Sequence, residues 1–397
     1  MAEVIISKNR WHFGITTSYL SGFLELILAL LIGFGLISAG IAGGAWILGG
    51  IAAGAIVFYS YRLLGQQSLQ PNRNSRKVGQ ALIGLMIGFS IQQNHLTSLS
   101  WQLPVFVAIA LFLLLSGGVI GFLYSRLEKI DLLTATLATT PGNIGVMASI
   151  AADYEKNTAL VSLVQLIRFT TIILVVPLIA HVAYFPTIWD TIHALTKDLS
   201  VFNPTYLLLL LVVLITTFLS VYWGGKLKIP VASFFCPIIV GIAFASLLVL
   251  LPSGAYPSFN LPPILRVLGQ ILLGTTIGEY WGMNPPLGKA TVARAIVPVS
   301  LMFFAGGLAA TFAKLFIHAD WLTCLLLAAP GGSPEMIWIS LTLNHNVEIV
   351  TAGHLVRLLT LNIALPGLVS LVSYLESRLD HKVPSEVESA GELRIEN

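Results

Sequence analysis

The sequence TTPGNIGVM at residues 139–147 decides the fold, because it recurs as AAPGGSPEM at residues 328–336. Pro141 and Pro330 are the prolines of the two copies, and the interval between them sets a fixed spacing along the chain. Self-similarity at a fixed spacing is the sequence signature of a duplicated structural unit. The Pro-Gly element therefore predicts that the chain contains two copies of one unit.

Other positions keep this spacing or nearly so. The stretch VGQALIGLMIGF at 78–89 resembles LGQILLGTTIGE at 268–279, where the interval is one position longer. Polar and proline positions around the Pro-Gly element also stay in register, which shared hydrophobicity alone does not explain. These pairs are Asp131 with Asp320, Gln165 with His354, Arg168 with Arg357, and Pro177 with Pro366.

Composition places the chain in the membrane. Apolar residues make up 56 % of its 397 residues and charged residues only 10 %, where soluble domains carry about 25 % charge. Uninterrupted apolar stretches of about twenty residues recur throughout, and each is long enough to cross roughly 30 Å of hydrocarbon. We therefore expect an all-α protein that crosses the bilayer many times.

Twelve apolar segments can be delimited. They divide into two repeats of six, a first repeat at 16–184 and a second at 204–376, followed by a polar C-terminal tail at 377–397. The segments are 16–37, 40–60, 78–92, 103–123, 132–150, 158–184, 204–222, 229–251, 263–281, 290–316, 321–342 and 347–375.

The distribution of lysine and arginine favours inverted repeats. If the Pro-Gly segments 132–150 and 321–342 return to their starting side, the two repeats have opposite orientations. Lys226, Lys228 and Lys289 then lie in the cytoplasm with the basic residues of the first repeat, as the positive-inside rule requires. With twelve full spans, the repeats are parallel and these three lysines lie outside. The inverted arrangement also places the N-terminus in the cytoplasm.

The Pro-Gly elements are the leading candidates for a functional site. Proline removes a backbone donor and glycine loosens a helix, so Pro141, Gly142 and Pro330 are expected to break their segments. Freed backbone groups are tolerated inside a membrane only where protein buries them or where they line a wet cavity. A helix that restarts after such a break suits an anion, because its free amides carry positive charge. The alternative is a kink that only helps helix packing.

Two arginines occupy matching positions in long apolar segments. Charges at such positions are costly and usually face a bundle interior or an aqueous path, so Arg168 and Arg357 are candidate solute ligands. Snorkelling toward the interface is the alternative. Gln165 and His354 stand three residues earlier and share a helix face with their arginines. His354 could exchange protons near neutral pH, or it could be a hydrogen-bonded structural histidine.

Polar residues beside the breaks complete the candidate site. Glu335 follows the second break where the first copy has Val146. This asymmetric acid suits proton or cation coupling, and helix capping or pairing with an arginine is the alternative. Asp131 and Asp320 are expected to cap helices, and the isolated acids Glu25 and Glu279 receive no role. The other candidates are Asn143, Gly331, Gly332, Ser333 and Pro334.

Enzyme and cofactor motifs are missing from the sequence. It contains no GxxxxGK[ST] phosphate loop, no HExxH and no paired Cys-x-x-Cys. Cys236 and Cys324 both lie in apolar runs and are expected to be small buried hydrophobes. We therefore expect no enzyme activity, no cofactor and no metal, and the absence of a soluble basic domain argues against nucleic-acid binding.

The Pro-Gly element is duplicated, and its second copy reads PGGSPEM, with an aspartate before it and HLVRLL downstream. With these features the chain resembles the AbrB family of bacterial membrane proteins. The resemblance extends from about residue 21 to residue 378. The first copy departs from the fuller pattern, with Asn143 in place of Gly332 and Val146 in place of Glu335. The resemblance implies a bacterial inner-membrane location. The family has also been labelled an ammonia monooxygenase and a regulator of gene expression.

The leading hypothesis is a secondary transporter that moves a small, anionic solute by alternating access. A second hypothesis is a membrane regulator or sensor that binds a ligand without transporting it and affects gene expression indirectly. A membrane monooxygenase is a third, although the eight histidines are scattered along the sequence and copper requires clustered ones. The expected partners are the lipid bilayer and the solute, and homo-oligomerisation is left open.

Overall fold

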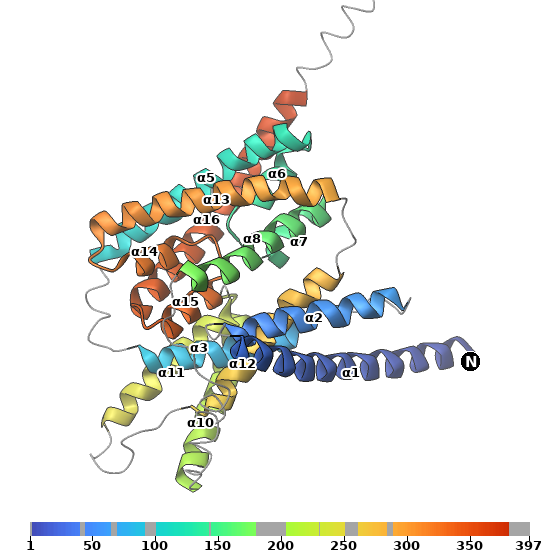
Figure 1. The fold of residues 1–397 in the computed structure, drawn as a ribbon, viewed down its shortest axis with the longest axis vertical. Helices are drawn as coiled ribbons and strands as arrows, with labels where there is room; N and C mark the ends of the chain where they lie inside the picture. Colours follow the sequence, from blue (N-terminus) through green and yellow to red (C-terminus); the bar gives the residue numbers. More distant parts are fainter. Residues whose placement is uncertain are drawn as a thin grey trace, which may run out of the picture. The chain divides into compact units, whose positions relative to one another are not determined.

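The protein is all-helical throughout the part that the structure describes. The computed structural model describes residues 2–39, 44–64, 70–91, 101–142, 144–179, 204–229, 231–250, 261–283 and 289–380, and contains no strand within them. Figure 1 labels the helices along the chain. The helices are α1 Ala2–Ser38, α2 Ala45–Leu63, α3 Arg73–Ser90, α5 Leu103–Glu128, α6 Leu132–Thr139, α7 Ile144–Asp153, α8 Thr158–Ile179, α10 Pro204–Lys226, α11 Ala232–Leu250, α12 Pro263–Met283, α13 Lys289–Phe316, α14 Trp321–Ala328, α15 Ser333–Thr342 and α16 Val347–Asp380.

Membrane-spanning length is common among these helices. Within the described ranges, seven helices are long and apolar enough to cross a bilayer: α1 from Leu20, α2, α5, α8, α10, α13 and α16. The prediction of an all-α, multi-pass membrane protein is confirmed at this level. Ten of the twelve apolar segments form one helix each.

The two segments that contain a Pro-Gly element are divided into two short helices each. The first gives α6, with 8 residues, and α7, with 10. The second gives α14 and α15, also with 8 and 10 residues. Helices of these lengths are only about 12 and 15 Å long, so none crosses the hydrocarbon alone. The predicted breaks are confirmed.

Aspartates begin both broken segments, as predicted. The Asp131 carboxylate accepts a hydrogen bond from the Thr134 amide at 2.7 Å and so caps α6. Asp320 caps α14 in the same way, accepting from the Thr323 amide at 3.0 Å. Such caps satisfy backbone donors that the first helical turn leaves free.

The chain folds into two compact units. Unit 1 comprises Met1–Ser100, Thr171–Pro285 and Ser333–Thr351, and unit 2 comprises Trp101–Thr170, Pro286–Gly332 and Ala352–Asn397. Each unit draws on both halves of the chain. The division into repeats at 16–184 and 204–376 concerns sequence similarity and stays a prediction, and most of the tail at 377–397 lies outside the described residues.

Glycines bring the helices of unit 1 into backbone contact. α2 packs along α12, where Gly50 and Gly54 face Gly274 and Gly278. α3 packs along α11 through Gly84, Gly88 and Gly241. Small residues allow membrane helices to approach closely, and the resulting packing drives their association. An apolar cluster that includes Ala29, Trp46 and Ile271 joins α1 to the α2–α12 pair.

Unit 2 contains α5 and α13 lying side by side (Figure 1). Arg294 near the start of α13 forms an ion pair with Glu128 at the end of α5, at 3.5 Å, so these two helices are antiparallel. α6 packs against α5 where Gly117 and Gly121 leave room for its backbone. The short broken helices are therefore supported by long ones.

Candidate functional site

The first break is tied to α8 by a buried arginine. Arg168 is only 1 % exposed. It donates to the Thr140 carbonyl at 3.3 Å and to the Gly142 carbonyl at 3.2 Å. Gln165 orients this arginine by accepting from it at 2.6 Å, and donates to the carbonyls of Leu137 and Thr140 at 2.9 Å. The carbonyl groups that the break frees are thus bound by side chains.

The second break has the same set of contacts, made by residues at the matching positions after the second Pro-Gly element. Arg357 donates to the Ala329 carbonyl at 2.6 Å and to the Gly331 carbonyl at 3.1 Å. His354 takes the place of Gln165, with Nδ1 at 2.7 Å from Arg357 and Nε2 at 3.0 Å from the Leu326 carbonyl. Arg357 is 5 % exposed and His354 is fully buried.

The two hydrogen-bond neighbours of His354 determine which of its ring nitrogens carries a hydrogen. A guanidinium group has only donors, so Nδ1 must accept from Arg357. Nε2 must then carry the hydrogen and donate to the Leu326 carbonyl. The imidazole is therefore neutral, and a proton on Nδ1 would break its bond to Arg357. This geometry favours the structural interpretation of His354 over proton exchange.

The two arginines bring positive charge together inside unit 2. The charge of Arg357 acts on Arg168, so the two guanidinium groups lie within electrostatic reach. Neither forms an ion pair with an acid of the described chain, where the three ion pairs involve Lys156 and Arg294.

Three polar atoms at the first break have no hydrogen-bond partner within the described residues. They are Arg168 Nε, Thr140 Oγ1 and Thr136 Oγ1, and their residues are at most 2 % exposed. The two threonines were not among the site residues predicted from the sequence. A signal existed, because the second copy has Leu325 and Ala329 at the matching positions, so the hydroxyl groups occur in one copy only.

The other predicted residues are distributed as follows. Gly142 and Gly331 contribute the carbonyls that the arginines bind, and Gly332 ends the second break. Asn143 lies outside the described residues. The first turn of α15 is formed by Ser333, Pro334 and Glu335 and belongs to unit 1. Glu335 is 4 % exposed and interacts electrostatically with Arg76 on α3.

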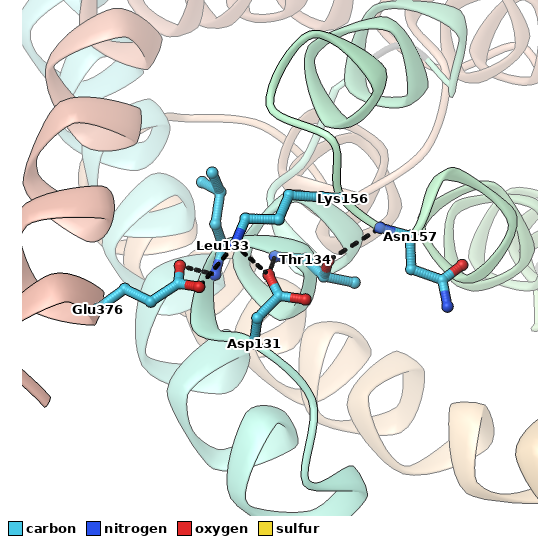
Figure 2. A network of polar contacts seen from close by, with 6 residues as sticks. All are labelled: Asp131, Leu133, Thr134, Lys156, Asn157 and Glu376. Carbon is cyan, nitrogen blue, oxygen red and sulfur yellow. Dashed lines mark hydrogen bonds and ion pairs between the residues drawn. The ribbon is translucent and has the colours of Figure 1, made fainter. Parts of the chain in front are cut away.

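A polar network joins both ends of the first broken segment (Figure 2). Lys156, which follows α7, lies 3.4 Å from Asp131 at the start of α6. The Asn157 amide donates to Thr134 Oγ1 at 3.3 Å. The chain after α7 therefore returns to the point where α6 begins, and the segment forms a hairpin.

Glu376 of α16 completes this network. It accepts a hydrogen bond from Lys156 at 2.6 Å and another from the Leu133 amide at 3.2 Å. Burial alone lowers the pKa of Lys156, but the hydrogen bond and charge of Glu376, together with the charge of Asp131, outweigh burial and raise it. The end of α16 therefore lies beside the turn that leads into α8.

Replacing Glu376 with glutamine is expected to lower the free energy of unfolding by about 1–2 kcal/mol at neutral pH, because a charge-assisted hydrogen bond is lost. Because the pKa of Lys156 is higher in the folded protein, its ion pairs contribute fully to stability at any pH below about 10.4, the pKa of lysine in the unfolded chain. That contribution is lost as the pH rises through the pKa of Lys156 in the folded protein. Thermal unfolding of the purified protein measures both effects. Glu155→Gln, an exposed neighbour, is the control, and equal behaviour of the two variants would contradict the assignment.

Metal-binding residues do not gather in the parts that the structure describes. No three His, Cys, Asp or Glu side chains in those ranges lie close enough together to hold an ion. Cys236 and Cys324 are both buried free thiols, as the sequence predicted.

Comparison with known proteins identifies one family. A family model described as "Transition state regulatory protein AbrB" matches residues 46–373. The chain is 25 % identical over 355 residues to "Putative regulator AbrB" of Escherichia coli (strain K12), covering 87 % of this chain and 95 % of that one. It is 26 % identical over 374 residues to "Uncharacterized protein YhjN" of Bacillus subtilis (strain 168), covering 89 % and 93 %. No solved structure matches the chain.

Proposed function

The chain belongs to the AbrB family, and we propose that it is a secondary transporter that moves a small anionic solute across a bacterial inner membrane by alternating access. The observation that carries this proposal is the pair of buried guanidinium groups without an acid partner in the described chain. A buried cation is costly unless it is paired. The anion that completes the pairing is the solute.

The first break offers the solute its free donors. Among the residues that the structure describes, neither Arg168 Nε–H nor the Thr140 hydroxyl has a hydrogen-bond partner. Charge-assisted hydrogen bonds from such groups are stronger than neutral ones. Arg357 adds positive charge, while its own bonds hold the second break in shape. A carboxylate or a phosphate-like oxyanion matches this set of donors.

Alternating access follows from inverted repeats, and two pairs of helices support the inversion. α3 matches α12, and α5 matches α13, in the two repeats. α5 and α13 are antiparallel. α3 and α12 are too, since Asn72 before α3 contacts Glu279 near the end of α12, while Gly79 meets Gly269. Antiparallel repeat mates are what a two-fold axis in the membrane plane produces.

The inverted arrangement also sets the topology. With hairpins at α6–α7 and α14–α15, the N-terminus, Lys129 and Lys156 face the cytoplasm. We propose that the protein acts without a cofactor, without enzyme activity and without nucleic acid, and that its partners are the bilayer and the solute. A homo-oligomer remains compatible with this scheme.

A second candidate function is ligand sensing without transport. The name of the Escherichia coli relative, "Putative regulator AbrB", favours it. The same anion site would then change contacts with a regulatory partner. Flux of the bound anion separates the two functions, because a sensor binds without transporting.

The proposal is tested by anion-dependent stabilisation of the purified protein, followed by flux. A ligand at 100 times its dissociation constant stabilises the fold by about 2.7 kcal/mol. Acetate, succinate and phosphate are the probes, and chloride at equal ionic strength is the control. The proposal predicts that at least one oxyanion raises the unfolding temperature and enters proteoliposomes. Stabilisation without flux would favour the sensor, and no stabilisation by any of the three would contradict an oxyanion site.

Thr140→Val is expected to weaken binding of the stabilising anion about tenfold, which corresponds to a loss of about 1.4 kcal/mol. It should leave the stability of the free protein unchanged, because Thr140 Oγ1 has no partner in the described chain. Anion titrations of thermal unfolding measure both quantities.

Thr139→Val is the matched control. Thr139 Oγ1 donates to the Gly117 carbonyl at 2.7 Å, so its loss should cost about 1 kcal/mol of stability without changing anion affinity. Equal effects of the two valine variants on affinity would remove Thr140 from the site.

A further inference from the structure

Two buried carboxyl groups meet in unit 1, which does not contain the arginine pair. Glu25 lies on α1 and is 4 % exposed, and Glu279 lies on α12 and is 2 % exposed. α1 and α12 are in contact, and the two carboxyl groups lie close enough to interact with each other. The backbone amide of Asn72, just before α3, donates to Glu279 Oε2 at 2.8 Å. Glu25 Oε1 has no hydrogen-bond partner within the described chain.

No cation of the described residues neutralises this pair. The three ion pairs found there all lie in unit 2. α2 presents Gly50 and Gly54 to α12 rather than a charged side chain. Among the basic residues of α2 and α3, Arg62 lies over the Tyr59 ring, Arg73 and Lys77 are exposed, and the charge of Arg76 acts on Glu335. The electrostatic surroundings of the pair are therefore the two carboxyl groups themselves and the Asn72 amide.

A hydrogen bond between two carboxyl groups requires a proton. Two carboxylates that share a buried site cannot both ionise, because their negative charges repel at low dielectric, and the pair then titrates as a unit. The Asn72 amide stabilises the ionised form of Glu279, which leaves the proton on Glu25. A metal ion fits less well, because hard cations require six or more oxygen ligands and no third acidic, His or Cys group joins the pair in the described chain.

We infer that Glu25 and Glu279 form a site that binds and releases a single proton. When the site is loaded, one neutral carboxylic acid donates to one carboxylate. When the proton leaves, two adjoining carboxylates remain, and their repulsion acts between α1 and α12. In the transporter proposed above, this site supplies the coupling ion, and only that use rests on the proposed function.

Infrared spectroscopy of the purified full-length protein, titrated with acid and base in the absence of solute, tests the site directly. A protonated carboxyl group in an apolar site gives a C=O stretching band that is separate from carboxylate bands. The wild type is expected to show this band at pH 7. Glu25→Gln, which retains the shape of the side chain, is expected to lose it, whereas Glu279→Gln is expected to shift it, because a lone buried Glu25 stays protonated. Glu155→Gln, which alters an exposed acid, should retain it.

Two outcomes would overturn the inference. The band could survive unchanged in both Glu25→Gln and Glu279→Gln, which would place the proton elsewhere. Alternatively, sodium chloride could abolish the wild-type band at constant pH where choline chloride does not, which would make the ligand a metal cation. Circular dichroism of each variant confirms that it is folded before its spectrum is compared. Because no solute is present, the result does not depend on transport, and failure of the anion test would leave it standing.

Discussion

Replacing Arg357 with methionine is expected to weaken anion binding strongly and to destabilise the protein by several kcal/mol. Methionine retains the apolar length of the side chain and removes the charge. The carbonyls of Ala329 and Gly331 would then lose their donors, and each buried unsatisfied group costs about 1–3 kcal/mol. Loss of one of two converging charges should weaken anion binding by a factor of about 10–100, corresponding to roughly 1.5–3 kcal/mol.

Arg357→Lys separates the charge of Arg357 from its geometry. Lysine is a point charge and cannot donate to two carbonyls through a planar fork. The variant should therefore retain part of the anion affinity while losing stability. Arg126→Met, which alters an exposed arginine over the Phe122 ring, is the control. Wild-type affinity in a folded Arg357→Met protein would remove this residue from the anion site, and Arg168→Met applies the same test to the first break.

Gly278→Val is expected to prevent unit 1 from folding, with a cost of about 3 kcal/mol or more. A Cβ atom at Gly278 would lie only 2.1 Å from the Ile51 carbonyl oxygen and 2.6 Å from the Ala55 amide nitrogen. Both are backbone atoms, so no side-chain rotation relieves the overlap, and α2 would have to move away from α12. Expression and size-exclusion chromatography of the membrane-extracted protein measure the effect.

Gly307→Val is the matched control for that substitution. Gly307 lies within α13, and a Cβ atom there would meet nothing within 4 Å. Valine should be tolerated at this position. If Gly278→Val and Gly307→Val gave equal yields of monodisperse protein, the close approach of α2 and α12 would be wrong.

Much of the fold could be predicted because its signals are local. Long apolar stretches define the long helices, proline and glycine define the breaks, and Asp131 and Asp320 begin the broken segments as caps. The interval between Pro141 and Pro330 predicted the elements well, since it also separates the start of α6 from that of α14 and the start of α7 from that of α15. Periodicity and local chemistry suffice for such features.

Features that depend on long-range packing could not be predicted. Sequence alone did not show that the charges of Arg168 and Arg357 interact, because that depends on how unit 2 combines segments from both halves. The role of His354 depends on which of its nitrogens faces Arg357. No role could be predicted for Glu25 and Glu279 from the sequence, because only the packing of α1 and α12 brings them together.

The central claim is that the two repeats are inverted, so that both arginine-bound breaks contribute to one site. Thiol accessibility at four matched positions tests it most directly, in protein whose Cys236 and Cys324 are replaced by alanine. Lys129 and Glu155 flank the first broken segment, and His318 and Asn344 flank the second at the same repeat positions. All four side chains are exposed.

Single cysteines at these positions would be labelled with a membrane-impermeant maleimide, applied first to intact cells and then to inverted vesicles. The inverted arrangement predicts that cysteines at 129 and 155 react only from the cytoplasmic side, and cysteines at 318 and 344 only from the outside. Reaction of the 129 and 318 cysteines from the same side would contradict the account, because the repeats would then be parallel.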